Sequence, residues 1–292
     1  MLRGRECATG RNPIHSSARE RKPPWKGARA MRPNAASSLL PVNTTLAVLL
    51  VVLLLAATAA VALFHLSPDV RTHRARQVLL AGVRAALQLA AVSAVITKVV
   101  GSGLATMAFL VLMLGVAVWT AGRRLTPDRS WWLALWPIAL SVLPVVSLLL
   151  LTGLVPPKGI VLIPVTGIFI GGALTATVLS GRRALDELDL RHGEFEAGLA
   201  LGLSDRDARM EIARPAASDA LLPGLDQTRT VGLVTLPGAF VGMLLGGASP
   251  TAAGAVQLFV LVALMAIQAV AVACTVELVA RGHLHRPRGG HR

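Results

Sequence analysis

Seven long apolar stretches, separated by shorter polar ones, dominate the chain. They occupy residues 43–65, 78–99, 103–120, 132–152, 159–180, 230–248 and 253–279. A helix needs about 20 residues to cross a hydrocarbon core about 30 Å thick, and each stretch is close to that length or longer. None of them shows the strict alternation of apolar and polar residues that is typical of a strand. We therefore predict an all-α, polytopic integral membrane protein with about seven transmembrane helices.

The composition agrees with a membrane protein. Hydrophobic residues make up 54% of the sequence and charged residues 15%, and the mean hydropathy is +0.64. These values lie outside the range of ordinary soluble domains. The net charge of +14 is concentrated in the tails, at residues 1–42 and after Ala280. Basic tails beside a membrane are typical of topology signals and lipid contacts, so we predict membrane lipid as a partner and no nucleic acid.

The distribution of arginine predicts the orientation. Arginines crowd the loops at 66–77, 121–131 and 181–229 and the C-terminal tail, whereas the opposite loops hold only Lys98 and Lys158. Cytoplasmic loops carry the excess of basic residues. We therefore expect the C-terminus and the loop at 181–229 to lie in the cytoplasm.

The chain is predicted to have three parts. Residues 1–42 form a basic tail that we expect to be disordered, residues 43–280 form one permease domain, and residues 281–292 form a basic cytoplasmic tail. With seven spans the N-terminal tail would lie on the outer side, against the positive-inside rule. Translation from Met31 would leave Arg32 as the only charge before the first span, so we hypothesise that the native start is Met31.

The polar loop at 181–229 has strong helix signals. Apolar residues spaced along one face predict a helix over 183–201, and Gly202 suits the left-handed position that ends it. Ser204, with an acid three residues on, predicts the N-cap of a second short helix that Pro215 breaks or kinks. A helix, a tight turn and a short amphipathic helix suit a groove on a partner protein. A surface hairpin without a partner has the same pattern, and that alternative stays open.

The order Glu196-Ala197, Gly202, Ile212 and Pro215 resembles the EAA loop of ABC-transporter permeases. In that family the loop docks on a separate ATPase subunit, so the resemblance implies that these residues couple the chain to such a partner. All four lysines of the chain follow residues other than glycine, so the Gly-Lys-Ser/Thr phosphate loop is absent from the sequence. We expect the chain to be no enzyme and to bind no cofactor, with ATP used by the partner subunit.

Three apolar stretches extend the resemblance over most of the chain, from about Leu46 to Arg281. They are Arg84–Leu89, Gly167–Thr177, and Thr230–Gly242 with its continuation through Gly246–Pro250 to Gln257. These stretches are similar to the FetB-type family of ABC permeases, which is linked to iron export in bacteria and to aluminium tolerance in plant relatives. The resemblance implies a permease of the plasma (inner) membrane that exports a metal ion such as iron. It also implies a homodimer working with two ATPase subunits of the FetA type.

Three positions depart from the family pattern. Gly172 stands where asparagine is common, Met243 where glutamine is common, and Arg214 where leucine is usual. The first two changes remove polar groups at membrane depth, where a polar cargo would need them. A cargo different from that of the family therefore remains an alternative.

Small residues recur at four-residue spacing in two of the stretches. The set that we predict to serve helix packing or a hinge comprises Gly167, Gly171, Pro237, Gly238, Gly242 and Gly246. Such strips allow helices to approach closely, and we expect this within one subunit. A contact that slides during transport is the alternative, and Pro237 is expected to act as a hinge or a static kink.

Polar residues inside the spans are the candidates for a transport pathway. They are Arg84, Gln88, Thr175, Thr177 and Gln257. Arg84 is expected either to extend to the interface or to face the bundle interior, and the two threonines are expected to bond to their own helix. Glu277 is expected to pair with Arg281. Metal ligands stay unknown, because the histidines of the C-terminal tail, His283, His285 and His291, lack an acidic or cysteine partner in the sequence nearby.

Three other functions remain open. An ABC permease for a non-metal solute would have the same loop. A secondary transporter or channel normally carries acids within the membrane, and only Glu277, near a helix end, is a candidate here. A structural membrane scaffold would explain the apolar stretches but not the loop at 181–229.

Overall fold

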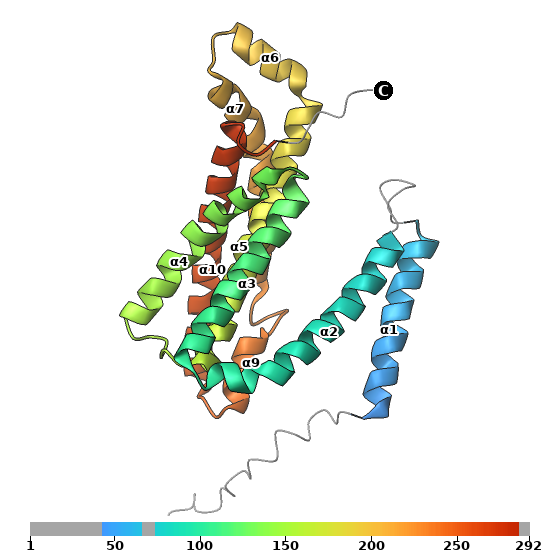
Figure 1. Ribbon diagram of the computed structural model, residues 1–292, viewed down its shortest axis with the longest axis vertical. Coiled ribbons are helices and arrows are strands. Elements are labelled where there is room, and N and C mark those ends of the chain that lie inside the picture. Colours follow the sequence, from blue (N-terminus) through green and yellow to red (C-terminus); the bar gives the residue numbers. More distant parts are fainter. Residues whose placement is uncertain (1–42, 66–73, 286–292) are drawn as a thin grey trace, which may run out of the picture. The chain divides into compact units, whose positions relative to one another are not determined.

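The computed structural model describes residues 43–65 and 74–285, and these divide into two compact units, residues 1–75 and 76–292. All regular elements in the described residues are helices (Figure 1). Their one β-type interaction is an isolated bridge between Val231 and Thr235. The prediction of an all-α, polytopic membrane protein is confirmed. The proposed start at Met31 lies outside the described residues.

The first unit contains one described helix, α1 (Thr44–Leu63). Asn43 caps its N-terminus, because the Asn43 side chain accepts a hydrogen bond from the Leu46 N–H at 3.1 Å. The helix consists almost entirely of apolar residues, and none of them is buried. An apolar helix of this length that is exposed all round is suited to a lipid environment.

A transmembrane helix needs about 20 mostly apolar residues, and six helical segments in the described residues are long and apolar enough to cross a membrane. They are α1, α2 (Arg74–Val100), α3 (Gly103–Leu125), the segment Arg129–Leu151, α5 (Gly159–Leu190) and α10 (Pro250–Ala280). The fourth consists of the 3₁₀ turn η2 (Arg129–Ala134) followed by α4 (Leu135–Leu151). These segments match six of the seven predicted spans, and α5 continues ten residues beyond the predicted end at 180.

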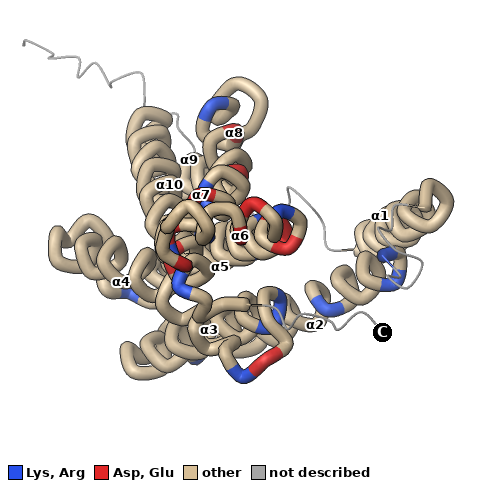
Figure 2. Tube along the Cα trace, turned by 90° about the horizontal axis from the view of Figure 1, so that it is seen from above, with Lys and Arg blue, Asp and Glu red and all other residues tan. Residues whose placement is uncertain are grey.

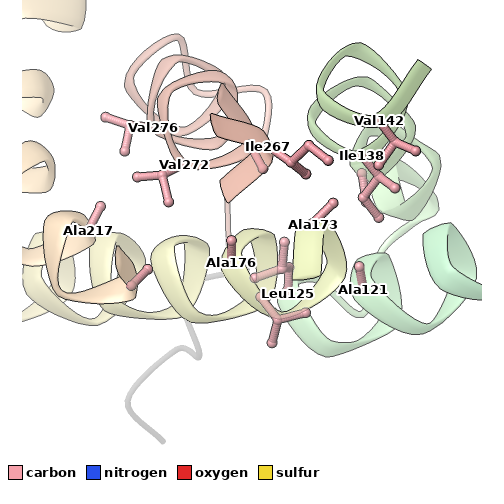
Figure 3. Close-up of a cluster of buried hydrophobic side chains, with 14 of the residues drawn as sticks. Ala121, Leu125, Ile138, Val142, Ala173, Ala176, Ala217, Ile267, Val272 and Val276 are labelled. Atoms are coloured by element: carbon pink, nitrogen blue, oxygen red, sulfur yellow. The ribbon is translucent and has the colours of Figure 1, made fainter. Parts of the chain in front are cut away.

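Helices α3, α4, α5 and α10 pack side by side into the core of the second unit (Figure 1). Alanine is the most frequent residue among the buried positions, and small residues allow helices to pack closely. Ala121 of α3, Ala173 of α5 and Ile267 of α10 have no exposed surface, and they point toward one shared interior (Figure 3). Helix α2 contributes little to this core, because Val99 at its C-terminal end is its one buried residue.

The sixth predicted span, residues 230–248, is wrong as a continuous helix. Helix α8 (Leu222–Thr230) ends where that span was expected to begin, and α9 (Gly238–Leu245) begins only after Pro237. Gly232 has φ +83°, a left-handed conformation that interrupts a helix, and Pro237 has no N–H to donate. Both α8 and α9 pack on α10, so this part of the chain runs alongside α10 as a discontinuous helix.

The polar elements gather at one end of the second unit. Arg182 Nε donates to the Arg124 carbonyl at 3.4 Å, and His285 lies 4.0 Å from Asp128. Viewed from this end, charged residues lie on α6 (His192–Ala200), α7 (Asp205–Ser218) and the loop after α3 (Figure 2). The arginine-rich loop at 121–131, the α6 and α7 part of the loop at 181–229 and the start of the C-terminal tail therefore share one end, as their charge predicted. The last part of that loop lies instead along α10, where Gly224 is next to Gln268. The position of the arginine-rich end in the cytoplasm remains a prediction.

Candidate coupling hairpin and transport pathway

A helical hairpin occupies the position of the predicted coupling loop. It consists of α6 (His192–Ala200) and α7 (Asp205–Ser218), followed by η3 (Asp219–Leu221). The single helix expected over 183–201 is interrupted, since α5 ends at Leu190 and Arg191 leaves the helical conformation before α6 begins. The exposed pair of Arg191 and Glu194 stabilises this bend, and the hydrogen bonds from Arg191 lower the pKa of the Glu194 carboxyl below its usual value.

The turn between the two helices has the predicted chemistry. Gly202 adopts φ +90°, which only glycine reaches without strain. Its N–H donates to the Leu199 carbonyl at 3.0 Å, and the Leu203 N–H donates to the Gly198 carbonyl at 3.1 Å. This pair of bonds is the Schellman arrangement that ends a helix. The prediction that Gly202 ends the first helix is confirmed.

The N-cap of α7 is also confirmed. The Ser204 side-chain oxygen accepts a hydrogen bond from the Asp207 N–H at 3.1 Å, and the Ser204 hydroxyl donates to the Asp207 carboxylate at 2.7 Å. The Asp207 N–H is one of the first N–H groups of the helix, which have no carbonyl partner within the helix, and the Ser204 side chain supplies one. Four residues connect α6 to α7, and within them the cap and the Schellman turn together set the angle between the two helices.

Side chains across the hairpin hold its two helices together. Arg209 lies over the Phe195 ring, 5.4 Å from its centroid, and also pairs with Asp205 at 3.0 Å. A Cβ on Gly198 would stand 3.3 Å from that of Ala208, so glycine permits the close approach of the helices. The hairpin is therefore an ordered element and not a loose loop.

The predicted coupling residues divide into two sets. Glu196, Ala197 and Gly202 are exposed on the hairpin, and Glu196 pairs with His192 at 3.2 Å. Ile212, in contrast, is only 4% exposed, because α7 packs on α5 and α10. Ile212 therefore lies in the interior of this chain, and its role in coupling remains a prediction. Pro215 is exposed, but α7 continues through it to Ser218, so the predicted break at Pro215 is wrong.

An ion pair joins α7 to the end of α10. Arg206 donates two hydrogen bonds to the Glu277 carboxylate, from Nε at 2.8 Å and from Nη2 at 2.7 Å. Arg281 adds a third at 2.6 Å, so the predicted pair of Glu277 and Arg281 is confirmed. The Glu277 carboxylate raises the pKa of the Arg206 guanidinium above its usual value. Sequence reasoning missed Arg206, since its partner lies 71 residues away and no local pattern connects them.

We expect the Arg206–Glu277 pair to stabilise the docked position of α7. Arg206→Ala and Glu277→Ala should each lower the midpoint of thermal unfolding. In the double variant the midpoint should fall by less than the sum of the two single decreases, because each single variant already removes the same bidentate bonds. A matched cycle on Asp226 and Arg229, an exposed pair 3.6 Å apart, should show almost no coupling. Equal coupling in the two cycles would contradict this role for Arg206.

Most of the predicted packing glycines do not approach other parts of this chain. A Cβ on Gly171, Gly238 or Gly242 would meet no neighbouring atom within 4 Å in the described residues, and one on Gly246 would meet only carbonyls of its own helix. The described residues therefore show no close packing at these positions, and their role in packing or as a hinge stays a prediction. A Cβ on Gly167 would lie 3.0 Å from Met113 Cε of α3, so a packing role for Gly167 remains a prediction.

The candidate pathway residues are not all brought together. Arg84 and Gln88 are exposed on α2. Thr175 is exposed and bonds to the Gly171 carbonyl at 2.9 Å, as expected, whereas the buried Thr177 hydroxyl has no partner in the described residues. Gln257 is 5% exposed, and its Oε1 also lacks a hydrogen-bond partner there.

Gln257 lines a cavity of about 180 Å³ beside the interrupted helix. The walls come from the bend after α8, the first turn of α9 and the N-terminal third of α10, with Val231, Pro237 and Phe240 among the lining residues. Every lining residue is uncharged. In the described residues no three His, Cys, Asp or Glu side chains are placed to hold a metal ion together.

Comparison with known proteins gives one family. The profile described as "Uncharacterised protein family (UPF0014)" matches residues 42–284. The chain is 34% identical over 214 residues to the UPF0014 membrane protein STAR2 of Oryza sativa subsp. japonica, covering 72% of this chain and 75% of that protein. It is 35% identical over 161 residues to Protein ALUMINUM SENSITIVE 3 of Arabidopsis thaliana, covering 55% of this chain and 59% of that protein.

A bacterial relative has a transport activity in its name. The chain is 30% identical over 118 residues to the probable iron export permease protein FetB of Escherichia coli (strain K12), covering 39% of this chain and 44% of that protein. No solved structure matches.

Proposed function

Because this chain belongs to the UPF0014 family of membrane proteins, we propose that it is the membrane-spanning permease subunit of an ABC transporter. Its partner is an ATPase of the FetA type, which hydrolyses ATP on the cytoplasmic side of the plasma (inner) membrane. The observation that carries the proposal is the α6–α7 hairpin, which exposes Glu196, Ala197 and Gly202 at the arginine-rich end. Two copies of the chain work with two ATPase subunits.

The hairpin has the connections that a coupling element needs. Its first helix follows α5 after one bend at Arg191, and its second helix packs on both α5 and α10. The Arg206–Glu277 pair attaches the start of α7 to the end of α10. A partner that displaces the hairpin therefore moves the ends of two membrane helices together, which is the kind of rigid-body movement that alternating access uses.

The proposed cargo is a metal ion, on the analogy of the iron export named for the Escherichia coli relative. A second candidate is a non-metal solute, which the surroundings of Gly172 favour. A Cβ at this position would overlap Leu264 of α10, so Gly172 serves close packing of α5 on α10. The asparagine that is common there in the FetB-type family would not fit without displacing Leu264. This chain therefore lacks a polar group where that family offers one.

Co-purification with an ABC ATPase in lipid tests the proposal. The ATPase should bind the wild-type chain, and Glu196→Lys should reduce the bound ATPase by more than tenfold, because it reverses a charge on the exposed hairpin. Gly202→Ala should weaken binding as well, since φ +90° costs a residue with a Cβ roughly 1–2 kcal/mol and distorts the turn.

Asp128→Lys provides a matched control. It makes the same charge reversal at the same end of the unit but in the loop before η2, outside the hairpin. We expect this variant to bind the ATPase like the wild type. If no ATPase co-purifies with the wild-type chain, the proposed function is contradicted and a secondary transporter is favoured. If Asp128→Lys loses as much bound ATPase as Glu196→Lys, the assignment of coupling to the hairpin is contradicted.

A further inference from the structure

An open groove of about 850 Å³ runs between α4 and α10, which lie side by side in the second unit (Figure 1). Both helices belong to segments that are long and apolar enough to cross a membrane. One wall of the groove contains Trp132, Trp136 and Leu140, which are spaced four residues apart, and each of these side chains is about half exposed. The groove is therefore a large apolar surface that no described part of the chain covers.

The polar residues of the groove gather at one end of it. On the α10 side, Ala273, Glu277 and Arg281 follow one another at four-residue spacing, over about 12 Å in all, and the chain after α10 adds His283. Trp132 is at the same end, because η2 directly follows the loop at 121–131. The groove thus leads from an apolar part to a polar part at the arginine-rich end, as a bilayer leads from acyl chains to headgroups.

Arg281 has hydrogen-bond donors to spare at the polar end. Its Nε donates to the Glu277 carboxylate at 2.6 Å, but its two Nη groups donate to no described residue, and its side chain is 58% exposed. Glu277 also accepts two bonds from Arg206, so both of its oxygens are occupied without the Nη groups of Arg281. Arg206 pairs in addition with Asp207, which does not line the groove. The exposed imidazole of His283 is a further donor, so this end is suited to an anion.

The two tryptophans match the depth of lipid headgroups. An indole ring has an apolar body and one N–H donor, and such rings are enriched where acyl chains meet headgroups. The Nε1–H groups of Trp132 and Trp136 donate to no described residue. They can therefore bond to oxygens of a lipid whose acyl chain lies along the same rings.

We propose that the groove between α4 and α10 is a binding site for an anionic phospholipid. Arg281 and His283 hold its phosphate, and one acyl chain lies along Trp136 and Leu140. Basic pockets between transmembrane helices bind lipid headgroups, and the cytoplasmic leaflet carries the anionic lipids. A second copy of this chain fits the groove less well, because an apolar helix laid over it would bury the free Nη groups of Arg281 without partners.

The test is quenching of the tryptophan fluorescence of the full chain in phosphatidylcholine nanodiscs. Each nanodisc contains the same minor fraction of a lipid with brominated acyl chains, either phosphatidylglycerol or phosphatidylcholine, and bromine quenches the tryptophans that it touches. Brominated phosphatidylglycerol should quench more strongly, because one basic residue near the membrane surface favours an anionic lipid about fivefold. This excess should be lost in the double variant Trp132→Phe with Trp136→Phe, which removes the two reporters from the groove.

Variants of the basic residues assign the excess to the groove. Arg281→Gln combined with His283→Gln should abolish it, while quenching by brominated phosphatidylcholine should stay as in the wild type, because the tryptophans still face lipid. Arg124→Gln is the matched control. It removes a positive charge from the last turn of α3 at the same end but outside the groove, and it should keep the excess.

Four outcomes would overturn the proposal. They are equal quenching by the two brominated lipids in the wild type, an excess that survives without Arg281 and His283, an excess that survives without Trp132 and Trp136, and an equal loss of the excess in Arg124→Gln. The last would show a general attraction of anionic lipid to the arginine-rich end. None of these outcomes depends on an ATPase, so a failure here is separate from a failure of the proposed function.

Discussion

Gly122→Ala is expected to destabilise the bundle by about 3 kcal/mol, at the upper end of what an added methyl group costs in a packed interior. Gly122 lies in α3 and has no room for a side chain. A Cβ there would come within 2.6 Å of the Trp131 carbonyl carbon and 2.8 Å of the Trp131 Cα. These are backbone atoms of η2, so a change of rotamer cannot relieve the overlap. Either the turn that connects α3 to α4 moves, or the two helices separate.

The measurement is the free energy of unfolding in mixed micelles, with Gly115→Ala as the matched control. Gly115 lies two turns earlier in the same helix, and a Cβ there would meet nothing within 4 Å in the described residues. Alanine is a better helix former than glycine, so Gly115→Ala should be neutral or stabilising by up to about 1 kcal/mol. Equal effects at the two positions would mean that the contact between α3 and η2 does not limit the packing.

Helix positions and local turns followed from the sequence because their causes are local. Apolar runs of sufficient length predicted six spanning segments, since the hydrocarbon thickness sets their length and the backbone must satisfy its own hydrogen bonds. Gly202 and Ser204 predicted the end of α6 and the start of α7, because a left-handed glycine and an N-cap hydroxyl each act within a few residues.

The errors concern properties that depend on tertiary structure. Residues 230–248 have the average hydropathy of a span, but the conformation of Gly232 and the missing N–H of Pro237 divide them into two helices, which average hydropathy does not detect. The spacing of Gly171, Gly238 and Gly242 indicated a smooth helix face, but not whether this chain covers that face. A periodic pattern identifies which residues share a face and gives no information about the neighbour.

The partner of Arg206 shows the same limit for charge. The loop at 181–229 has seven arginines, and the sequence does not distinguish the one that bonds to Glu277 from those that face solvent. Placing α7 against α10 requires the burial of Ile212, Ala213 and Ala217, which sets the register between the two helices. The ion pair is therefore a consequence of apolar packing that occurs further along α7.

Ile212→Ala is expected to destabilise the chain by about 2–5 kcal/mol, the usual cost of removing a large aliphatic side chain from a packed interior. Ile212 is 4% exposed in α7, and its neighbour Ala213 has no exposed surface. The measurement is again the free energy of unfolding in mixed micelles. Arg214→Ala is the control, because Arg214 is exposed two residues further along the same helix and should change stability by no more than about 0.5 kcal/mol.

The same pair of variants separates two roles for α7 in coupling. One possibility is that α7 transmits force because it is packed on α5 and α10. Ile212→Ala should then lower the free energy of unfolding, and it should weaken ATPase binding only indirectly, through the loss of the fixed position of the hairpin. If Ile212 instead contacts the ATPase directly, the variant should keep its stability and lose the partner. The second result would require α7 to leave its packed position when the ATPase binds, and the Arg206–Glu277 pair would then be broken in the working complex.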